Sequence, residues 1–586
     1  MLEECLAVFE KVLNKKGEKL ILNKYIPAEG SYIIVDRDGK VKDVIDIKMD
    51  KKTREIVDKS SEYYIDIILY DYYSKLLSMN KPIDSKKVIH SNNYLSFFVK
   101  KENVKNGKLT EAIIDNYYNI LANPLDNKYK KSKEASRIYQ EFVKSNGKPD
   151  EEVLNKNMKW IKEHIFKLEE IIPATKSIDM TKKDYLKIFF EADKEDYEKE
   201  SNRYILPNIY NCNDYNIEVN GKILGLADNN ISMNSKKPFL GHKNKKVVAP
   251  YLIDGQRAII QKKFFEYLMN MASLGKYNIY INTEKNRIEG YSDGEPVDSM
   301  ECGYFLHIAK GTELEIVTQD NISGYEKKLS EDFILEHVLN IEYKYHPEYE
   351  DFYKRYDYRY QIADVLNDIL FFKLLKSNYY TSPNDLRIND TVIKQNILTY
   401  RNMIFDWVYK GFNNGFIDRI ETCCKNIIKN SILNDYKERA ILQLDLYYSL
   451  RIYFKGEKNM SEIISDLRNS VKDKVLSKDV VNLSNDKEYY YAIGQLAGYL
   501  ISCNKSGNKA QSLINPFLNA TSDVLLKARL KQLYKKYNYD ISENSRRMKN
   551  LVTLIWGYEA KKVDEDMILL GYADNNIMFT KNDNEQ

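Results

Sequence analysis

The chain has 586 residues, of which 43% are hydrophobic and 12% aromatic. This composition excludes a globally disordered chain and supplies enough apolar material for more than one folded domain. Charged residues make up 30%, but the formal net charge is only +4, so the chain is not uniformly basic and any nucleic-acid surface must be local.

The first three-fifths of the chain predict a mixture of helices and strands. After an opening amphipathic helix, residues 32–35 and the residues from Lys40 onward predict two strands, joined by a turn over 36–39 whose Asp-Gly pair accepts positive φ angles. Residues 54–78 and 110–122 are expected to be helical. The charged stretch 130–172 is also expected to be helical, as a solvated face or an insertion.

A second strand-rich zone is expected over about residues 203–318. Residues 215–219 and 222–224 flank an Asn-Gly pair and predict a tight hairpin. A helix is expected over 264–271, and it is followed by short strand patterns. These patterns lie at 277–281, 287–288, 304–308 and 313–317.

From about residue 352 the apolar period changes to 3.6, which is typical of helices that pack in a bundle. The predicted fold class is therefore α+β: a mixed α/β N-terminal domain with antiparallel hairpins, followed by an all-helical C-terminal bundle. The predicted boundaries are 1–351 for the mixed domain, 352–459 for a helical connecting region and 460–586 for the bundle.

Known catalytic motifs are missing from the sequence: it has no GxxxxGK[ST] loop, no HExxH, no GxSxG and no glycine-rich dinucleotide fingerprint. The six histidines have no metal-ligand spacing, and His307 fits a satisfied core histidine in an apolar strand. Glu342 and Lys344, with Asp332 upstream, form a loose nuclease-like set that is common by chance. We therefore expect a binding protein and not an enzyme, with no catalytic residue, no metal and no cofactor.

The cysteines point to a reducing compartment. There are six, without any CxxC pair, so neither a zinc site nor a disulfide framework is expected. The acidic N-terminal helix does not resemble a signal peptide, and no apolar run reaches the roughly 20 residues of a membrane span. The expected location is the cytoplasm.

A basic, amide-rich loop is the first candidate binding feature. Between Ile231 and Val247 there are five lysines and no acidic residue, and Pro238 and Gly241 oppose a regular helix. Lysines engage phosphates and asparagine amides engage base edges, although a solvated loop would have the same composition. The candidate residues are Asn229, Asn230, Asn234, Lys236, Lys237, Lys243, Lys245 and Lys246.

The second candidate feature is the segment 505–549, which holds ten basic and three acidic residues. Lys527, Lys531 and Lys535 have i, i+4 spacing and are expected to line one helix face. Such a face follows a nucleic-acid backbone without reading its sequence, although a solvated helix face is the plain alternative. The candidates are Lys527, Arg529, Lys531, Lys535, Lys536, Arg546, Arg547 and Lys549.

Residues 455–459 permit codons that would form a ribosome-binding sequence and a short spacer before Met460. We therefore hypothesise an internal translation start that would yield residues 460–586 as a separate helical product.

Several segments together resemble one protein family, the large subunit of the type I-B CRISPR surveillance complex (Cascade). Each segment is weak alone, but their order and spacing fit the family. They are Glu29–Val35 with its turn, Ser91–Phe98 with Lys100, Lys237–Leu240, Ala249–Pro250, Phe264–Leu268, Tyr489–Ala497, Asn515–Leu518 and Gly571–Tyr572.

The resemblance implies a function in antiviral defence without catalysis. The large subunit sits at the 5′ end of the guide RNA, recognises the protospacer-adjacent motif in double-stranded DNA and supports R-loop formation. It also helps to recruit a separate helicase-nuclease. The implied partners are guide RNA, target DNA, the backbone, guide-end and small subunits of the complex and that helicase-nuclease, with no membrane.

The resemblance also bears on the candidate residues. It implies that the C-terminal bundle is similar to the small subunit of the complex, and it suggests the loop at 229–246 for motif reading. Paired CxxC motifs of some relatives are missing from this sequence, so zinc is not carried over. Two alternatives stay open: a metal-dependent nuclease of another defence system that uses Glu342 and Lys344, and a helical scaffold that binds only protein.

Overall fold

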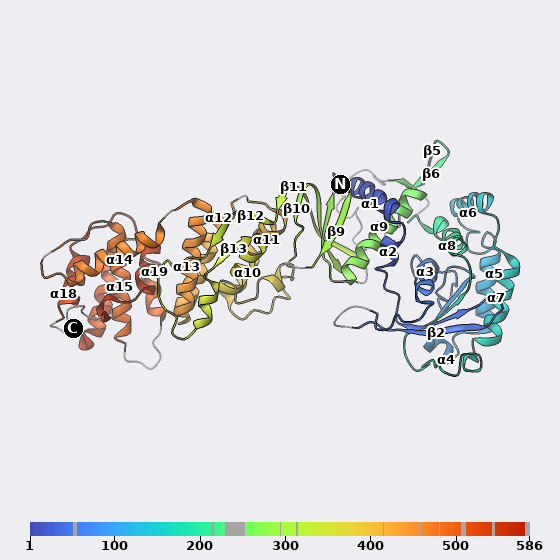
Figure 1. The fold of residues 1–586 in the computed structure, drawn as a ribbon, viewed down its shortest axis with the longest axis horizontal. Helices are drawn as coiled ribbons and strands as arrows, with labels where there is room; N and C mark the ends of the chain where they lie inside the picture. The colour runs from blue at the N-terminus through green and yellow to red at the C-terminus, as the bar shows by residue number, and fades with distance from the viewer. Residues whose placement is uncertain are drawn as a thin grey trace. The chain divides into compact units, whose positions relative to one another are not determined.

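The computed structural model describes residues 1–50, 56–211, 216–228, 252–292, 295–311, 314–413, 415–457, 459–479, 481–504, 511–541 and 545–580. The chain divides into two compact units, coloured mainly blue to green and yellow to red in Figure 1. Unit 1 consists of residues 1–293 and 300–323. Unit 2 consists of residues 294–299 and 324–586.

A four-stranded sheet with the order β2–β1–β4–β3 organises the first part of unit 1. The central strands β1 and β4 are parallel, and each outer strand is antiparallel to its neighbour. β1 is buried at every residue, as expected for a strand covered on both faces. The elements are α1 (Leu2–Lys16), α2 (Lys19–Leu22), β1 (Gly30–Val35), β2 (Val41–Ile47), α3 (Tyr64–Ser74), β3 (Ser96–Lys100), α4 (Lys101–Lys105), α5 (Glu111–Ala122), α6 (Lys133–Asn146), α7 (Glu151–His164), β4 (Tyr185–Phe190) and α8 (Lys194–Asn208).

The second part of unit 1 holds a three-stranded sheet, β5–β6–β7, and a four-stranded sheet, β11–β10–β8–β9. Between them runs the long helix α9, whose Asp254 cap accepts a hydrogen bond from the backbone N–H of Arg257 at 2.8 Å. The elements are β5 (Ile217–Val219), β6 (Lys222–Gly225), β7 (Ile253–Asp254), α9 (Gly255–Ser273), β8 (Asn278–Asn282), β9 (Arg287–Tyr291), β10 (Ser299–Lys310) and β11 (Leu314–Glu326). Ser299, the first residue of β10, and residues 324–326 of β11 belong to unit 2.

Unit 2 begins with a short two-stranded sheet and continues as helices. Helices α15 and α19 approach each other backbone to backbone, which only glycine permits at Gly494 and Gly571. A Cβ atom at Gly494 would collide with the α19 backbone, and one at Gly571 with the backbone of Tyr491. The elements are β12 (Lys328–Ile334), β13 (Arg355–Tyr358), α10 (Arg359–Ile369), α11 (Thr391–Lys410), α12 (Phe416–Leu433), α13 (Lys437–Lys455), α14 (Met460–Leu476), α15 (Asp486–Ser502), α16 (Asn515–Leu518), α17 (Asp523–Tyr537), α18 (Arg546–Trp556) and α19 (Glu565–Ala573).

The predicted fold class is confirmed: the chain is α+β, with antiparallel hairpins in its N-terminal region and a run of helices at its C-terminal end. Both predicted tight hairpins are present, as β1–β2 and β5–β6. The predicted helix over 54–78 is too long. Helix α3 begins only at Tyr64, because the Asp58 carboxylate accepts from the Ser60 N–H at 2.8 Å and holds a turn there.

The compact units and the predicted domains are divided at different places. Compactness separates the units near residue 323, whereas the change of hydrophobic period predicts a boundary at 351. Strands β12 and β13 explain the difference, because they pair with each other and belong to unit 2. Helices α10–α13 correspond to the predicted connecting region, and α14 begins at Met460, the first residue of the predicted bundle.

Candidate nucleic-acid interface

Helix α17 carries five of the eight candidate residues of the second basic segment. Its cap is Ser522, whose side chain accepts a hydrogen bond from the Leu525 N–H at 3.4 Å. A stripe at Leu526, Leu530 and Leu533 is buried, so the opposite face of the helix is exposed to solvent. That exposed face carries Lys531, Lys535 and Lys536.

Helix α18 repeats this arrangement. It is capped by Ser545, whose hydroxyl accepts from the Met548 N–H at 3.3 Å, and its buried stripe consists of Met548, Leu551, Leu554 and Ile555. The stripe is strictly periodic, which fixes the outward direction of the remaining side chains. Arg546 and Lys549 lie on this exposed side.

Two of the predicted binding residues are engaged inside unit 2. The Lys527 ammonium pairs with Asp523 at 3.1 Å and donates to the carbonyl of Tyr558. The Arg547 guanidinium donates to the carbonyls of Ile577, Met578 and Thr580. Of the three lysines expected to share a face, Lys531 and Lys535 are exposed, whereas Lys527 is held against the fold. Arg529 is half-buried.

The exposed cations of α17 and α18 have no acidic partner among the described residues, although the Lys536 ammonium lies over the Tyr537 ring at 5.2 Å from its centroid. Within the described part of the chain, no carboxylate lies at ion-pair distance from any of them. We use the name α17–α18 basic face for this set of residues on the exposed sides of two separate helices; it consists of Lys531, Lys535, Lys536, Arg546 and Lys549. Sequence reasoning missed three neighbouring residues: Trp556, on the same side of α18 as Arg546 and Lys549, and the exposed Lys561 and Lys562 that follow the helix.

The other predicted site, the loop with Asn229, Asn230, Asn234, Lys236, Lys237, Lys243, Lys245 and Lys246, lies outside the described residues. Its described borders belong to one sheet, since Leu224 and Gly225 of β6 pair with Asp254 and Ile253 of β7. The buried carboxylate of Asp228 pairs with Lys81, whose ammonium also donates to the Tyr210 carbonyl at 2.7 Å. These contacts fix the chain where the predicted loop begins.

The residues of the alternative nuclease site do not form a metal centre in the part of the chain that the structure describes. Asp332 pairs with Arg355, while the side chains of Glu342 and Lys344 are exposed. The described residues contain no group of three or more His, Cys, Asp or Glu side chains that could hold a metal ion. Lys344 is fixed through its backbone N–H, which donates to Glu438 at 2.8 Å.

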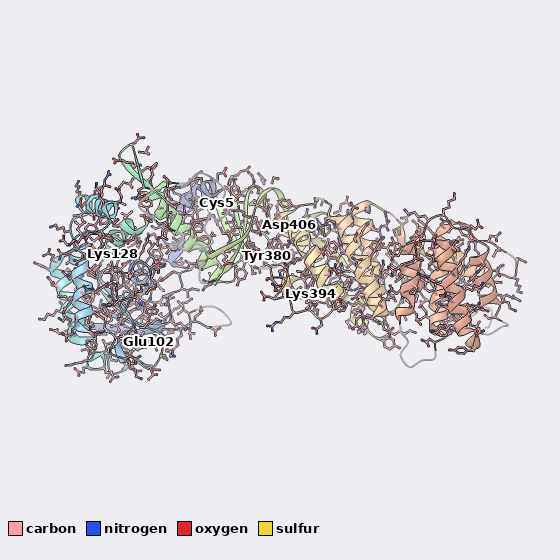
Figure 2. The ribbon with its side chains drawn as sticks, turned by 180° about the vertical axis from the view of Figure 1, so that it is seen from behind. Cys5, Glu102, Lys128, Tyr380, Lys394 and Asp406 are labelled. Atoms are coloured by element: carbon pink, nitrogen blue, oxygen red, sulfur yellow. The ribbon has the colours of Figure 1, made fainter. Side chains whose placement is uncertain are left out.

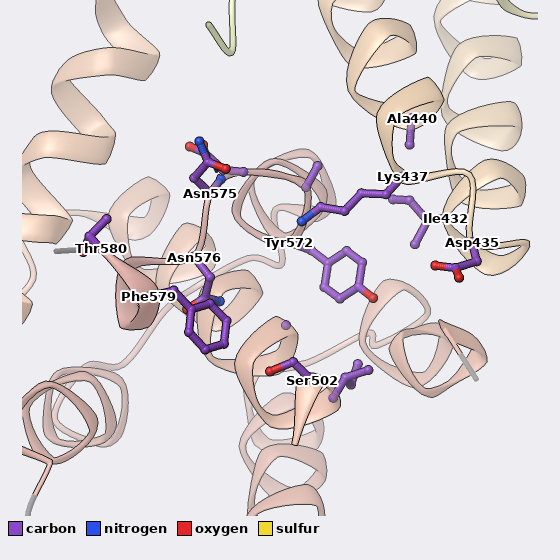
Figure 3. A pocket seen from close by; sticks show the side chains of 14 residues that line it. Ile432, Asp435, Lys437, Ala440, Ser502, Tyr572, Asn575, Asn576, Phe579 and Thr580 are labelled. Atoms are coloured by element: carbon purple, nitrogen blue, oxygen red, sulfur yellow. Dashed lines mark hydrogen bonds between the residues drawn. The ribbon is translucent and has the colours of Figure 1, made fainter. Parts of the chain in front are cut away.

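Unit 2 also has a cleft of about 500 Å³ beside the turn between α12 and α13. Figure 3 shows Lys437, Asp435 and Tyr572 around this cleft. Burial lowers the pKa of the Lys437 ammonium, although the charges of Asp574 and Asp435 act in the opposite direction. An adjoining cleft of about 820 Å³ contains Glu342 and Lys344 and shares Lys437 with the first. None of the described candidates on α17 and α18 lines either cleft.

Other candidate chemical groups are part of the core. His307 is buried and hydrogen-bonds through Nδ1 to the Asn278 side-chain oxygen at 2.8 Å, which confirms its interpretation as a satisfied core histidine. Cys5 lies on α1 in Figure 2, and burial raises the pKa of its thiol to about 12. Among the described cysteines, Cys5, Cys302, Cys423 and Cys424 are free, and Cys212 lies outside the described residues.

None of the described helices is long and apolar enough to cross a membrane. No model of a protein family, no curated protein and no solved structure matches the chain.

Proposed function

We propose that this protein is the large subunit of a type I-B CRISPR effector complex, acting in the cytoplasm without a catalytic site of its own. The proposal combines the resemblance in the sequence with one structural observation, the α17–α18 basic face. Five exposed cations on two adjacent chain segments have no carboxylate partner among the described residues. A surface of this kind attracts a polyanion, because each phosphate contact releases condensed counterions.

The proposed mechanism divides recognition between protein and RNA. Base pairing with guide RNA reads the long target sequence, while the protein reads a short adjacent motif and holds the backbone; single-protein CRISPR effectors follow the same logic. In this mechanism the 229–246 loop contacts the motif through Asn229, Asn230 and Asn234 and the phosphates through its lysines. The α17–α18 basic face then supports the displaced strand.

The proposal is tested by expressing a tagged full chain in its native host and sequencing the RNA that co-purifies. We expect guide RNAs with repeat-derived 5′ ends, together with backbone subunits. We also expect the purified complex to bind double-stranded target only when an adjacent motif is present. Purification without nucleic acid, and without salt-sensitive DNA binding, would instead support the scaffold that binds only protein.

A paired substitution tests the motif-reading loop in that complex. Lys236→Ala with Lys237→Ala should weaken binding to all targets and reduce the slope of log K against log salt by about one unit per lysine. Asn234→Ala should instead relax the preference for the adjacent motif while guide pairing stays intact. An unchanged affinity and slope in the lysine variant would remove this loop from the interface.

A further inference from the structure

Helix α18 has an outward stripe that combines positive charge with one large aromatic side chain. Arg546, Lys549, Thr553 and Trp556 are all exposed, and their spacing of three or four residues places them on one helix face. At a rise of about 1.5 Å per residue, the stripe is on the order of 15 Å long. The helix contains no acidic residue between Arg546 and Trp556.

Trp556 is partly exposed, unlike the apolar residues of the buried stripe of α18. The apolar residues of the buried stripe are at most 5% exposed, whereas Trp556 is 40% exposed. A single exposed apolar side chain is common on protein surfaces and means little alone. Here it continues a line of two cations, Arg546 and Lys549, that have no carboxylate partner among the described residues. A further pair of exposed lysines, Lys561 and Lys562, follows it in the chain.

The backbone next to Trp556 is held in place. The Gly557 N–H donates to the Thr553 carbonyl at 2.9 Å, and the Tyr558 hydroxyl donates to Asp486 at 2.8 Å. The Tyr558 ring stacks on Tyr489 with 5.1 Å between centroids, and Lys527 donates to the Tyr558 carbonyl. The indole is therefore attached to a fixed turn, so little backbone entropy is lost when a ligand binds it.

We propose that Trp556 is a base-stacking platform for single-stranded DNA whose phosphates lie along Arg546 and Lys549. An aromatic face accepts any base without reading its identity, and neighbouring cations follow the backbone. The charge of the stripe favours a polyanion over an apolar partner, and Glu559 is the only carboxylate between Trp556 and Lys562. The inference rests on the proposed function insofar as the displaced strand of the target would supply the DNA.

The fluorescence of the chain makes the test specific. Of the three tryptophans, Trp160 and Trp407 are 7% and 1% exposed, so a ligand that contacts the surface reports through Trp556. Titration of the full chain with an oligothymidylate of about 15 nucleotides should quench this fluorescence. An abasic strand of the same length should bind more weakly and leave the fluorescence unchanged, because it has the phosphates but no bases.

Variants measure the contribution of stacking to affinity. With a labelled oligothymidylate, Trp556→Leu should weaken binding about tenfold, which is typical of one lost stacked base, while Trp556→Phe retains most of the affinity. The loss should vanish when wild type and Trp556→Leu are compared on the abasic strand. Tyr345→Leu is the matched control, since Tyr345 is an 83% exposed aromatic of the same unit outside this stripe, and it should leave binding unchanged.

Three outcomes would overturn the inference: no quenching by oligothymidylate, equal wild-type affinity for the abasic strand, or tighter binding of an oligouridylate than of the DNA. The wild-type comparison of the two strands decides the question even if Trp556→Leu fails to fold. Because the titration uses the chain alone, it is independent of the guide-RNA purification. Quenching without guide RNA would retain the platform and reject the CRISPR assignment, and guide RNA without quenching would do the reverse.

Discussion

Two buried carboxylates, one in each unit, differ in their partners and in the direction of their pKa shifts. Glu266 of unit 1 contacts the ammonium groups of Lys75 at 2.7 Å and Lys262 at 2.8 Å. Burial alone would raise the pKa of Glu266, but these two charges lower it to about 2. Asp445 of unit 2 instead accepts hydrogen bonds from the Tyr353 hydroxyl and the Leu339 N–H, at 2.7 and 2.9 Å. These bonds do not offset burial, which raises its pKa to about 7.

The partner of a buried acid, and not its burial alone, decides how that acid affects stability. The folded-state pKa of Glu266 is lowered, so its contribution is present above pH 4.5 and is lost as the pH falls toward 2. The folded-state pKa of Asp445 is raised, so its contribution is present below pH 3.8 and is lost as the pH rises through 7. The two units should therefore respond to pH in opposite directions at these positions.

The largest expected effect comes from removing the anion of unit 1. Glu266→Leu leaves Lys262 buried without a counter-ion and the Tyr72 hydroxyl, 2.8 Å away, without its acceptor. Breaking a buried ion pair on one side typically costs about 3–5 kcal/mol. Hydrogen–deuterium exchange of the α9 peptides should accelerate by roughly a hundredfold or more, the factor that corresponds to about 3 kcal/mol.

Two controls separate the lost partner from lost packing. The double variant Glu266→Leu with Lys262→Met should recover most of the protection, because replacing a buried pair by apolar side chains is often neutral. Glu191→Gln breaks the more exposed pair with Lys42, at 2.9 Å, and should cost less than about 1 kcal/mol. Equal losses from Glu191→Gln and Glu266→Leu would show that burial does not distinguish the two pairs.

The second effect concerns the acid of unit 2. In wild type, the free energy of unfolding should fall by roughly 2–3 kcal/mol between pH 5 and pH 8, because Asp445 must ionise while buried. Asp445→Asn cannot ionise and should abolish this part of the pH dependence. Urea unfolding of a Trp160→Phe background follows unit 2, since Trp407 and Trp556 both belong to it.

The quantity to compare is the difference in the free energy of unfolding between wild type and variant at each pH. Titrations that the two proteins share cancel in this difference. The stability of the variant relative to wild type should be higher at pH 8 than at pH 5. A difference that stays constant from pH 5 to pH 8 would mean that Asp445 ionises in the folded state without cost, and the contrast with Glu266 would disappear.

Local patterns in the sequence predicted much of the fold. The Asn220-Gly221 pair predicts the β5–β6 turn because both residues adopt positive φ, and the leucine spacing in 526–533 predicts the buried face of α17. The division near residue 323 was not predicted, because it depends on the long-range pairing of β12 with β13 and not on any local period.

The candidate site was predictable only in part. Charge spacing correctly places Lys531 and Lys535 on an exposed face, and the i, i+4 spacing of Asp523 and Lys527 is a local sign of their ion pair. The contact of Lys527 with the Tyr558 carbonyl could not be predicted in this way, because the two residues are 31 positions apart. The sequence does indicate Trp556, because it follows Arg546 by ten residues on a helix without acids. Its position is difficult to recognise, because the neighbouring apolar residues Leu554 and Ile555 belong to the buried stripe.

The smallest expected effect extends the comparison to lysines on a single helix. Lys527 has its partner inside the fold, whereas the partner of Lys531 would be a phosphate of the ligand. On a single-stranded oligothymidylate, Lys531→Gln should lower affinity a few-fold and reduce the slope of log K against log salt by about 0.7, the value for one phosphate contact. Lys527→Gln should leave that slope unchanged and lower stability by about 1 kcal/mol, since it loses the pair with Asp523 and the contact over the Tyr489 ring.

The slope is the decisive readout, because a lysine that only supports the helix changes affinity through folding and not through counterion release. If Lys527→Gln changed the slope as much as Lys531→Gln, the internal pair would have to open when DNA binds, and a lysine's partner in the unbound protein would no longer identify its role.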